Sequence, residues 1–302
     1  MKSLLRNLWG LIQTLRPKQQ VKNVFVFAAL VFDQKLANWP ILAKTVLAFL
    51  IFCLVAGTVY IINDLVDLEK DKLHPKKRRR ALPSGHLRPW FAIAGAAVIL
   101  AVGLPVAYRL HPYFFAIVLG YFLINLAYTF YLKHLVIIDV MTVASGFVLR
   151  VAAGVVVAEA ERFSPWLYVC TIFLALFMAI GRRRHELILL SENAENHRKI
   201  LNEYAVPFLD QMTIVVVTAT LIAYSLYTAT ATNLPCNHGM LLTIPFVIYG
   251  MFRYLYLVQV KGQGGAPEDL LFTDRPFLVD VLLWGVAVIL VMYLFYSPPC
   301  SS

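Results

Sequence analysis

The chain has 302 residues, of which 60% are hydrophobic and 15% are charged, and its mean hydropathy is +0.71. This composition excludes a water-soluble domain, because repeated apolar runs of about twenty residues are typical of membrane spans. The formal net charge of +10 indicates orientation in a bilayer rather than binding to nucleic acid.

Nine apolar segments predict membrane-spanning helices, and therefore an all-α, polytopic membrane protein. The predicted spans cover residues 22–36, 41–62, 89–108, 112–131, 136–157, 164–181, 208–230, 238–258 and 277–296. The N-terminal twenty residues are amphipathic and basic, and no cleavable signal peptide is predicted in them. Lys18 and Lys22 lie four residues apart, so on an α-helix they would share one face at the mouth of the first span. There they would meet a lipid phosphate or serve as interfacial anchors.

An acidic motif follows the second span. Asn63, Asp67 and Asp71 are spaced by four residues, and Asp64 is three residues from Asp67, so a helix places all four on one face. Carboxylates that hold Mg²⁺ incompletely usually leave its other positions to substrate phosphates. The cations that follow at once could neutralise the rest of such a phosphate group; they are Lys76, Lys77, Arg78, Arg79 and Arg80. The alternative is a solvated acidic helix end followed by a basic cytoplasmic loop.

The distribution of basic residues predicts the orientation. With the N-terminus inside, 21 of the 27 Lys and Arg residues fall in the predicted cytoplasmic segments. We therefore expect a multi-pass protein of the cytoplasmic (inner) membrane whose acidic motif faces the cytoplasm.

Further ionisable residues stand at the ends of spans or inside them. Tyr128 and Lys133 close the fourth span, where they could reach a phosphate or act as ordinary interfacial residues. Asp139 and Arg150, eleven residues apart in the fifth span, are expected to pair with other helices rather than with each other.

The sixth span ends in a basic cluster. Arg182 and Arg183 could bind phosphate, and Glu186 could complete a metal site, although cations at a helix C-terminus also stabilise its dipole. The polar region 191–207 predicts a loop with a short helix, and 259–276 predicts a flexible lid. The cysteines are scattered, which predicts neither a zinc site nor a disulfide.

The acidic motif together with Leu82-Pro83-Ser84-Gly85 resembles the UbiA-type intramembrane prenyltransferases. Family members usually have Pro after the residue corresponding to Arg80, whereas this chain has Ala81. The aromatic prenyltransferases of the family carry a second Asp-rich motif after the sixth span, where this chain has Gly181-Arg182-Arg183-Arg184-His185-Glu186. That replacement resembles the decaprenyl-phosphate phosphoribosyltransferase branch.

The resemblance implies a single UbiA-like domain over 1–302, with about nine helices around a central cavity open to the cytoplasm and sideways to lipid. It implies transfer of 5-phosphoribose from phosphoribosyl pyrophosphate to a polyprenyl phosphate, with Mg²⁺ as cofactor, in the supply of arabinose donors for the cell envelope. Asn63, Asp64, Asp67 and Asp71 would hold the metal, and Asp71 or Glu186 would stabilise charge on the ribose. The residues expected to bind substrate are Lys18, Lys22, Lys77, Arg78, Arg80, Tyr128, Lys133, Arg150, Arg182 and Arg183.

Two alternatives remain open from the sequence. One is an aromatic prenyltransferase of the same superfamily, and the other, from a different class, is a lipid or ion transporter. Nucleic acid is not expected as a partner. The oligomeric state is also left open, including a homo-oligomer.

Overall fold

The computed structural model describes residues 2–73, 77–160, 164–191, 203–263 and 267–294. The regular elements of this part of the chain are helices, as the hydropathy pattern predicted. In chain order they are α1 (Lys2–Thr14), η1 (Pro17–Phe27), α2 (Ala28–Phe32), α3 (Trp39–Val66), α4 (Leu68–Leu73), η2 (Lys77–Arg79), α5 (Pro89–Leu110), α6 (Pro112–Phe130), η3 (Leu132–His134), α7 (Ile138–Val157), α8 (Pro165–Ser191), α9 (Val206–Thr230), η5 (Gly239–Thr243), α10 (Ile244–Leu255), η6 (Tyr256–Val260), α11 (Pro267–Thr273), α12 (Arg275–Ile289) and η7 (Leu290–Leu294).

Within the described residues, 8 helical segments are long and apolar enough to cross a membrane. They correspond to eight of the nine predicted spans. The largest difference concerns α8, which continues past the predicted end at residue 181 to Ser191. The basic cluster after Gly181, predicted at a helix end, therefore lies on the last turns of α8.

The first predicted span is built differently from the others. Its N-terminal part, η1, is a 3₁₀-helix that starts after Arg16, whose backbone is left-handed with φ 52°, and the short α2 follows. At about 2.0 Å per residue in a 3₁₀-helix and 1.5 Å in an α-helix, the two together extend about 30 Å. This length matches the hydrocarbon core of a bilayer, so about nine crossings remain consistent with the structure.

Residues three apart face the same side of a 3₁₀-helix, and η1 buries Asn23 and Val26 in this way. A Cβ atom at Gly154 of α7 would lie only 2.0 Å from the carbonyl oxygen of Val26. Glycine thus lets the backbones of η1 and α7 come into direct contact. The expected common face of Lys18 and Lys22 is wrong for the same reason, because residues four apart on a 3₁₀-helix point about 120° apart.

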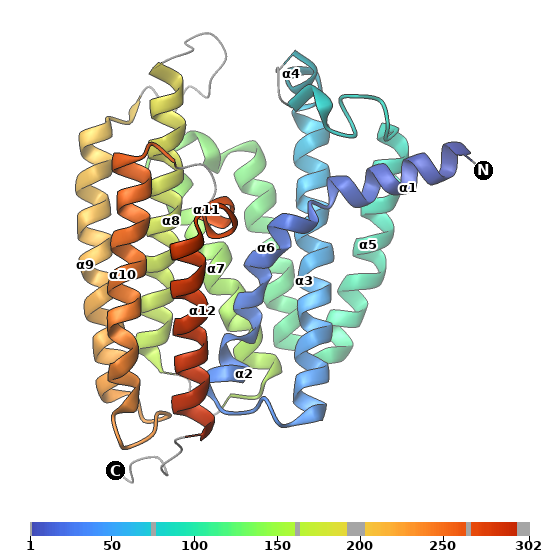
Figure 1. Cartoon of the computed structure of the whole chain (residues 1–302). Helices are drawn as coiled ribbons and strands as arrows, with labels where there is room; N and C mark the ends of the chain where they lie inside the picture. Colours follow the sequence, from blue (N-terminus) through green and yellow to red (C-terminus); the bar gives the residue numbers. More distant parts are fainter. Residues whose placement is uncertain (1, 74–76, 161–163, 192–202, 264–266, 295–302) are drawn as a thin grey trace.

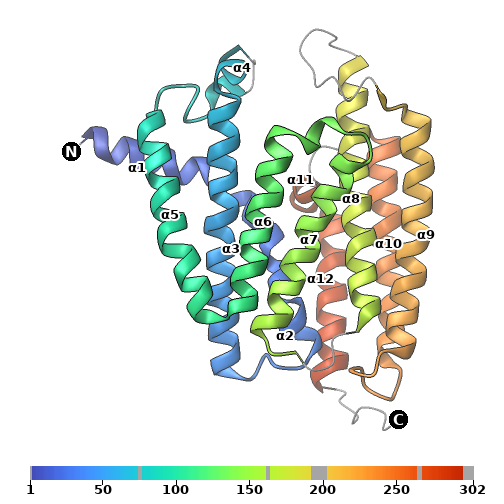
Figure 2. The ribbon, with the colours of Figure 1, turned by 180° about the vertical axis from the view of Figure 1, so that it is seen from behind.

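The long helices run side by side, with α3, α5 and α6 in one half of the bundle and α8, α9, α10 and α12 in the other (Figure 1). The two views place α7 between the halves (Figure 2). Helix α1 lies across one end of the bundle, where α4 and the C-terminal end of α8 also lie. The acidic motif and the arginine cluster are therefore at the same end.

Apolar side chains also cover the outer surface of the long helices. Trp90 and Val98 of α5, Ile214 of α9 and Leu282 of α12 are each more than half exposed. In a water-soluble protein such a surface would promote association, whereas lipid tails solvate it. Helix α1 continues this surface, since Leu5 and Trp9 are also more than half exposed.

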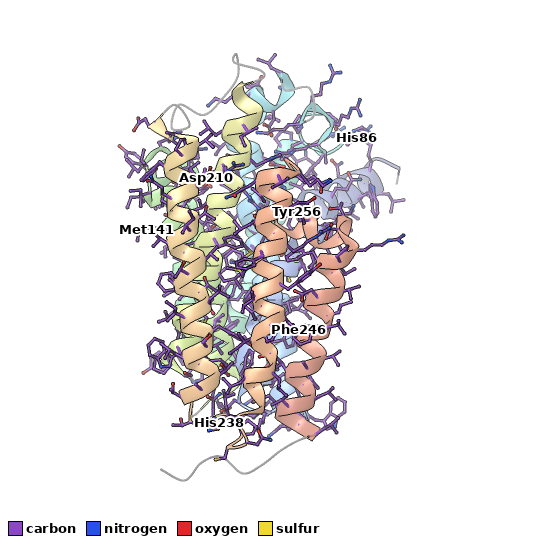
Figure 3. All side chains as sticks on the ribbon, turned by 60° about the vertical axis from the view of Figure 1, so that its left-hand side comes forward. His86, Met141, Asp210, His238, Phe246 and Tyr256 are labelled. Carbon is purple, nitrogen blue, oxygen red and sulfur yellow. The ribbon has the colours of Figure 1, made fainter. Side chains whose placement is uncertain are left out.

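Figure 3 shows His238 at one end of the bundle and His86 and Asp210 toward the other. Cys236, two residues before His238, is disulfide-bonded. The expectation of no disulfide was therefore wrong, because scattered spacing along the chain says little about distance in the fold. Most of the predicted loop between 191 and 207 also lies outside the described residues. The predicted lid contains the helix α11.

Candidate active site

The acidic motif lies where α3 gives way to α4. The helical winding continues through the break, because the N–H of Asp67 donates to the Asn63 carbonyl at 3.0 Å and that of Asp71 donates to the Asp67 carbonyl at 2.8 Å. Asp64 and Asp71 are therefore two turns apart on one face, and each is only 2% exposed. The spacing argument is confirmed for this pair.

Basic side chains from two segments meet these two carboxylates. Arg80 Nη1 lies 3.2 Å from Asp64 Oδ1 and 2.7 Å from Asp71 Oδ2. Lys77 Nζ lies 3.4 Å from Asp71 Oδ1. Arg16 Nη2 donates to Asp64 Oδ1 at 2.5 Å. Three cations thus surround two carboxylates, leaving an excess of positive charge suited to an anionic ligand.

The fold explains how these cations are held. The loop that carries Arg80 is anchored by Leu82 and Leu87, which are buried against Ile61 of α3. Gly85, with φ 75°, makes the tight turn between the two leucines. The guanidinium of Arg16 stacks over the ring of Tyr60 at 4.8 Å. Arg16 was missing from the predicted site. The pair Arg16-Pro17, at the end of the amphipathic N-terminal segment, could have indicated a cation at the start of the first span.

Asp67 is directed to a different helix connection. Its carboxylate lies 3.8 Å from Nζ of Lys133 in η3. Asn63 is half-buried and Arg78 is exposed. The turn between α6 and α7 is therefore brought next to the acidic motif.

A second polar cluster lies between α6, α7 and α8. The guanidinium of Arg183 donates to Asp139, to Glu186 Oε2 at 2.5 Å and to the Tyr128 hydroxyl at 2.7 Å. The Tyr204 hydroxyl donates to Asp139 Oδ1 at 2.7 Å. Burial and the hydrogen bond to Asp139 raise the pKa of Tyr204 above its usual value, so this hydroxyl keeps its proton. We name these five residues the buried network.

The expectation that Asp139 pairs with another helix is confirmed by Arg183 of α8. Tyr128 and Glu186 both contact Arg183; Tyr128 and Arg183 were predicted to bind substrate, and Glu186 to act on the ribose or complete a metal site. Arg183 is only 3% exposed, so its guanidinium is engaged with protein groups rather than open to a phosphate. Tyr204 had no recognisable signal in the sequence, because its role depends on a fold that returns it to α7.

Arg150 occupies a third position, inside the membrane. Its Nε donates to Asn23 Oδ1 at 2.6 Å, and its two Nη atoms donate to the Gly146 carbonyl at 2.6 Å and to the Tyr121 hydroxyl at 2.8 Å. Eleven residues along α7 separate it from Asp139 by about 16 Å. Arg150 thus joins η1 to α6 and α7, and it does not lie with the acidic motif. Arg182 is half-buried near the end of α8, while Lys18 is exposed and Lys22 half-buried in η1.

The acidic motif fits a divalent cation by its chemistry. Mg²⁺ prefers oxygen ligands and is commonly held by one or two carboxylates, with substrate phosphates completing its coordination. Asp64 and Asp71 converge closely enough to share one guanidinium nitrogen. Among the described residues, no three His, Cys, Asp or Glu side chains form a metal-binding group on their own. Two carboxylates, with Asn63 and Asp67 nearby, therefore match an ion that arrives with an anionic substrate.

Comparison with known proteins agrees with this geometry. The model of the UbiA prenyltransferase family matches residues 23–273. The decaprenyl-phosphate phosphoribosyltransferase of Corynebacterium glutamicum is 32% identical over 94% of this chain and 87% of its own length. That of Mycobacterium tuberculosis is also 32% identical, over 92% of this chain and 93% of its own length.

A solved structure shares the fold. A UbiA homolog from Archaeoglobus fulgidus, bound to DMAPP and Mg²⁺, superposes with a TM-score of 0.72 at 20% identity, over 93% of this chain and 98% of that one. Both the sequence and the helical arrangement therefore agree over nearly the whole length. This chain belongs to the UbiA prenyltransferase family, in the branch of the decaprenyl-phosphate phosphoribosyltransferases.

Proposed function

We propose that this protein transfers 5-phosphoribose from phosphoribosyl pyrophosphate to a polyprenyl phosphate of the decaprenyl type and releases pyrophosphate. The observation that carries this proposal is the 32% identity, over nearly the full length of both chains, to enzymes named for that acceptor and that transfer. The end of α8 supports it, because Arg182, Arg183 and Arg184 stand where aromatic prenyltransferases carry a second acidic motif.

In the proposed reaction, an oxygen of the lipid phosphate attacks C1 of the ribose. The bond from C1 to the pyrophosphate oxygen breaks, and the pyrophosphate leaves with the electron pair. The attacking oxygen is already ionised at pH 7, so no residue has to remove a proton. The protein then has two tasks, which are to position the two substrates and to stabilise the charge on the leaving group.

Asn63, Asp64, Asp67 and Asp71 are the residues proposed to hold Mg²⁺. When bound there, the ion would act as a Lewis acid on the leaving pyrophosphate. Lys77, Arg78 and Arg80 are proposed to bind the phosphates of the donor. In the structure Arg80 contacts the carboxylates of Asp64 and Asp71. If Arg80 turned to a donor phosphate while Mg²⁺ bound the two carboxylates, every charge would keep a partner of opposite sign.

The lipid substrate is proposed to approach from the bilayer. Lys18, Lys22 and Lys133 are the candidates for its phosphate, because a polyprenyl tail keeps that phosphate at headgroup level. The soluble donor would enter from the cytoplasm over the loop that contains Arg80. The excess of Lys and Arg at the end of the bundle with the acidic motif supports a cytoplasmic site in the inner membrane. The disulfide at Cys236, toward the opposite end, fits an oxidising exterior.

The test is direct. Membranes containing the protein are incubated with labelled phosphoribosyl pyrophosphate and decaprenyl phosphate, and the lipid fraction is examined for label. A labelled lipid that depends on both substrates is expected. In a parallel incubation with a prenyl diphosphate and 4-hydroxybenzoate, we expect no prenylated aromatic product. The opposite pair of results would favour the aromatic prenyltransferase instead.

A further inference from the structure

Tyr204 connects the segment before α9 to the start of α7. Its side chain is buried, with 5% exposed, and its ring stacks on Phe208 at 6.5 Å. The hydroxyl accepts the N–H of Ile137 at 2.7 Å and donates to Asp139 Oδ1 at 2.7 Å. One hydroxyl group thus uses both its acceptor and its donor function in the buried network.

The peptide that Tyr204 holds has an unusual conformation. Ile137 has φ 69° and ψ −46°, a region that β-branched residues rarely adopt. Such a conformation persists only where the surrounding structure enforces it. Because Ile137 directly precedes α7, its conformation sets where that helix begins, and Asp139 is the second residue of α7.

The network has one exposed end. Asp139 is fully buried, and its other oxygen accepts from Nε of Arg183. Arg183 in turn holds Glu186, whose side chain is 35% exposed. Two carboxylates and one guanidinium leave a net charge of −1, and Glu186 is the carboxylate that reaches the surface. The network thus presents its negative charge at Glu186.

The same region is next to the acidic motif. Helix α6 provides Tyr128 to Arg183, and η3, directly after α6, provides Lys133 to Asp67. Glu186 and the acidic motif are therefore connected through α6 and the turn that follows it. A carboxylate there would stabilise positive charge as it develops on the ribose.

We propose that Tyr204 is a positioning residue that orients Glu186 toward the reacting ribose by fixing Asp139 and, through it, Arg183. This inference rests on the proposed function. Loss of the Tyr204 hydroxyl leaves Asp139 with one partner fewer, and Arg183 is then no longer held in a single orientation. Since the charge on the ribose exists only near the transition state, the effect falls on kcat rather than on substrate binding.

The experiment compares Tyr204→Phe with Tyr224→Phe. Tyr224 is a matched control, because it is 6% exposed and its hydroxyl contacts Thr243 Oγ1 at 2.6 Å and Trp284 Nε1 at 2.9 Å, away from the network. Hydrogen-bond partners that orient metal ligands contribute about 10- to 100-fold to activity, and we use the lower end of that range for a residue that orients a carboxylate. We expect kcat to fall by about tenfold in Tyr204→Phe, with both KM values unchanged within about twofold. Tyr224→Phe should lower the Tm without this loss of kcat.

A double variant identifies the route of the effect. If Tyr204 acts through Glu186, adding Tyr204→Phe to Glu186→Gln causes no further loss of kcat. Multiplicative losses, an unchanged kcat in Tyr204→Phe, or equal behaviour of the two tyrosine variants would each overturn the proposal. If the wild type makes labelled lipid and Tyr204→Phe makes it equally fast, only the positioning role fails. If the wild type makes no labelled lipid, the proposed function is wrong, and the positioning role of Tyr204 is wrong as well.

Discussion

The acidic motif and the buried network contain the same kinds of charged groups in different settings. At the acidic motif the cations are accessible, since the side chains of Arg16, Arg80 and Lys77 are 20%, 33% and 40% exposed. In the buried network the side chains of Arg183 and Asp139 are 4% and 0% exposed. The first set is carried by a helix cap and a loop, and the second by the helices α7 and α8.

This difference separates two uses of an ion pair. An accessible cation can exchange a carboxylate for a phosphate at little cost to the cation, because water and ligand replace the lost partner. The buried carboxylates of Asp64 and Asp71 would then be compensated by the bound Mg²⁺. A buried guanidinium that loses its carboxylate leaves a charge without compensation, which costs much more. The arginines at 182–184 look alike in the sequence. In the structure Arg183 is held between Tyr128 of α6 and Asp139 of α7.

The largest expected effect is on stability. Arg183→Ala leaves the Asp139 carboxylate buried with the Tyr204 hydroxyl as its remaining hydrogen-bond partner, and breaking a buried pair in this way costs about 3–5 kcal/mol. We expect a lower free energy of unfolding, measured by thermal denaturation in detergent. Arg184→Ala, whose partner Asp210 is 32% exposed, is the control and should lose less. A variant at Arg183 with normal stability and a raised KM for the donor would show that Arg183 binds phosphate directly.

The second prediction concerns metal. Asp67→Ala removes a proposed metal ligand whose ion pair with Lys133 is long, at 3.8 Å, so the fold should persist. Turnover should fall on the order of 100-fold, because a Lewis acid lowers the barrier by several kcal/mol. EDTA should abolish the activity of the wild type, and Mg²⁺ should restore it. Glu69→Ala, which removes a side chain that is 81% exposed, should change nothing. Full activity of Asp67→Ala would contradict the metal assignment.

The third prediction separates the two substrates. Lys22→Ala should raise the KM for polyprenyl phosphate roughly ten- to hundredfold, because one charge-assisted contact is worth about 1.5–3 kcal/mol. The KM for phosphoribosyl pyrophosphate should stay nearly unchanged. Arg78→Ala should show the reverse pattern. Because η1 is a 3₁₀-helix, Lys18 and Lys22 face different directions, so Lys18→Ala should differ from Lys22→Ala in its effect. Equal shifts of both KM values in every variant would mean that the cations act as one shared field.

The smallest expected effect is at a half-buried ion pair outside both clusters. Arg253 donates to Asp274 through Nη2 at 2.8 Å and through Nε at 3.1 Å. This pairing holds the pKa of Asp274 below its usual value. A lowered pKa contributes stability above the pKa of the unfolded state, and this contribution disappears as the pH falls through the folded pKa. Asp274→Asn keeps the helix cap of α12 and should lower Tm by no more than about 3 °C at neutral pH. The difference from wild type should vanish well below pH 4; a difference that persists there would mean that the ion pair is not its source.

The sequence by itself determined the membrane-spanning architecture and the position of the acidic motif. Both depend on local properties, since span length follows from the apolar run and the face of a helix follows from spacing along it. Asp64 and Asp71 thus converge as their spacing required. The excess of cations after them was also evident, because Lys77 and Arg80 follow within the same connection.

Only the tertiary structure decided which partners the charged residues have. Asp139 meets Arg183 and Tyr204 from 44 and 65 positions away along the chain, and no local pattern encodes such a distance. Arg16 reaches Asp64 from 48 positions away, and η1 adopts a 3₁₀-helix and packs against Gly154 of α7. The 3₁₀ winding itself is set by this packing rather than by intrinsic preference, since hydrogen bonds in an isolated 3₁₀-helix are poorer than those in an α-helix. Contacts between helices, rather than the sequence of any one helix, therefore determine which charged side chains can exchange partners and which are fixed.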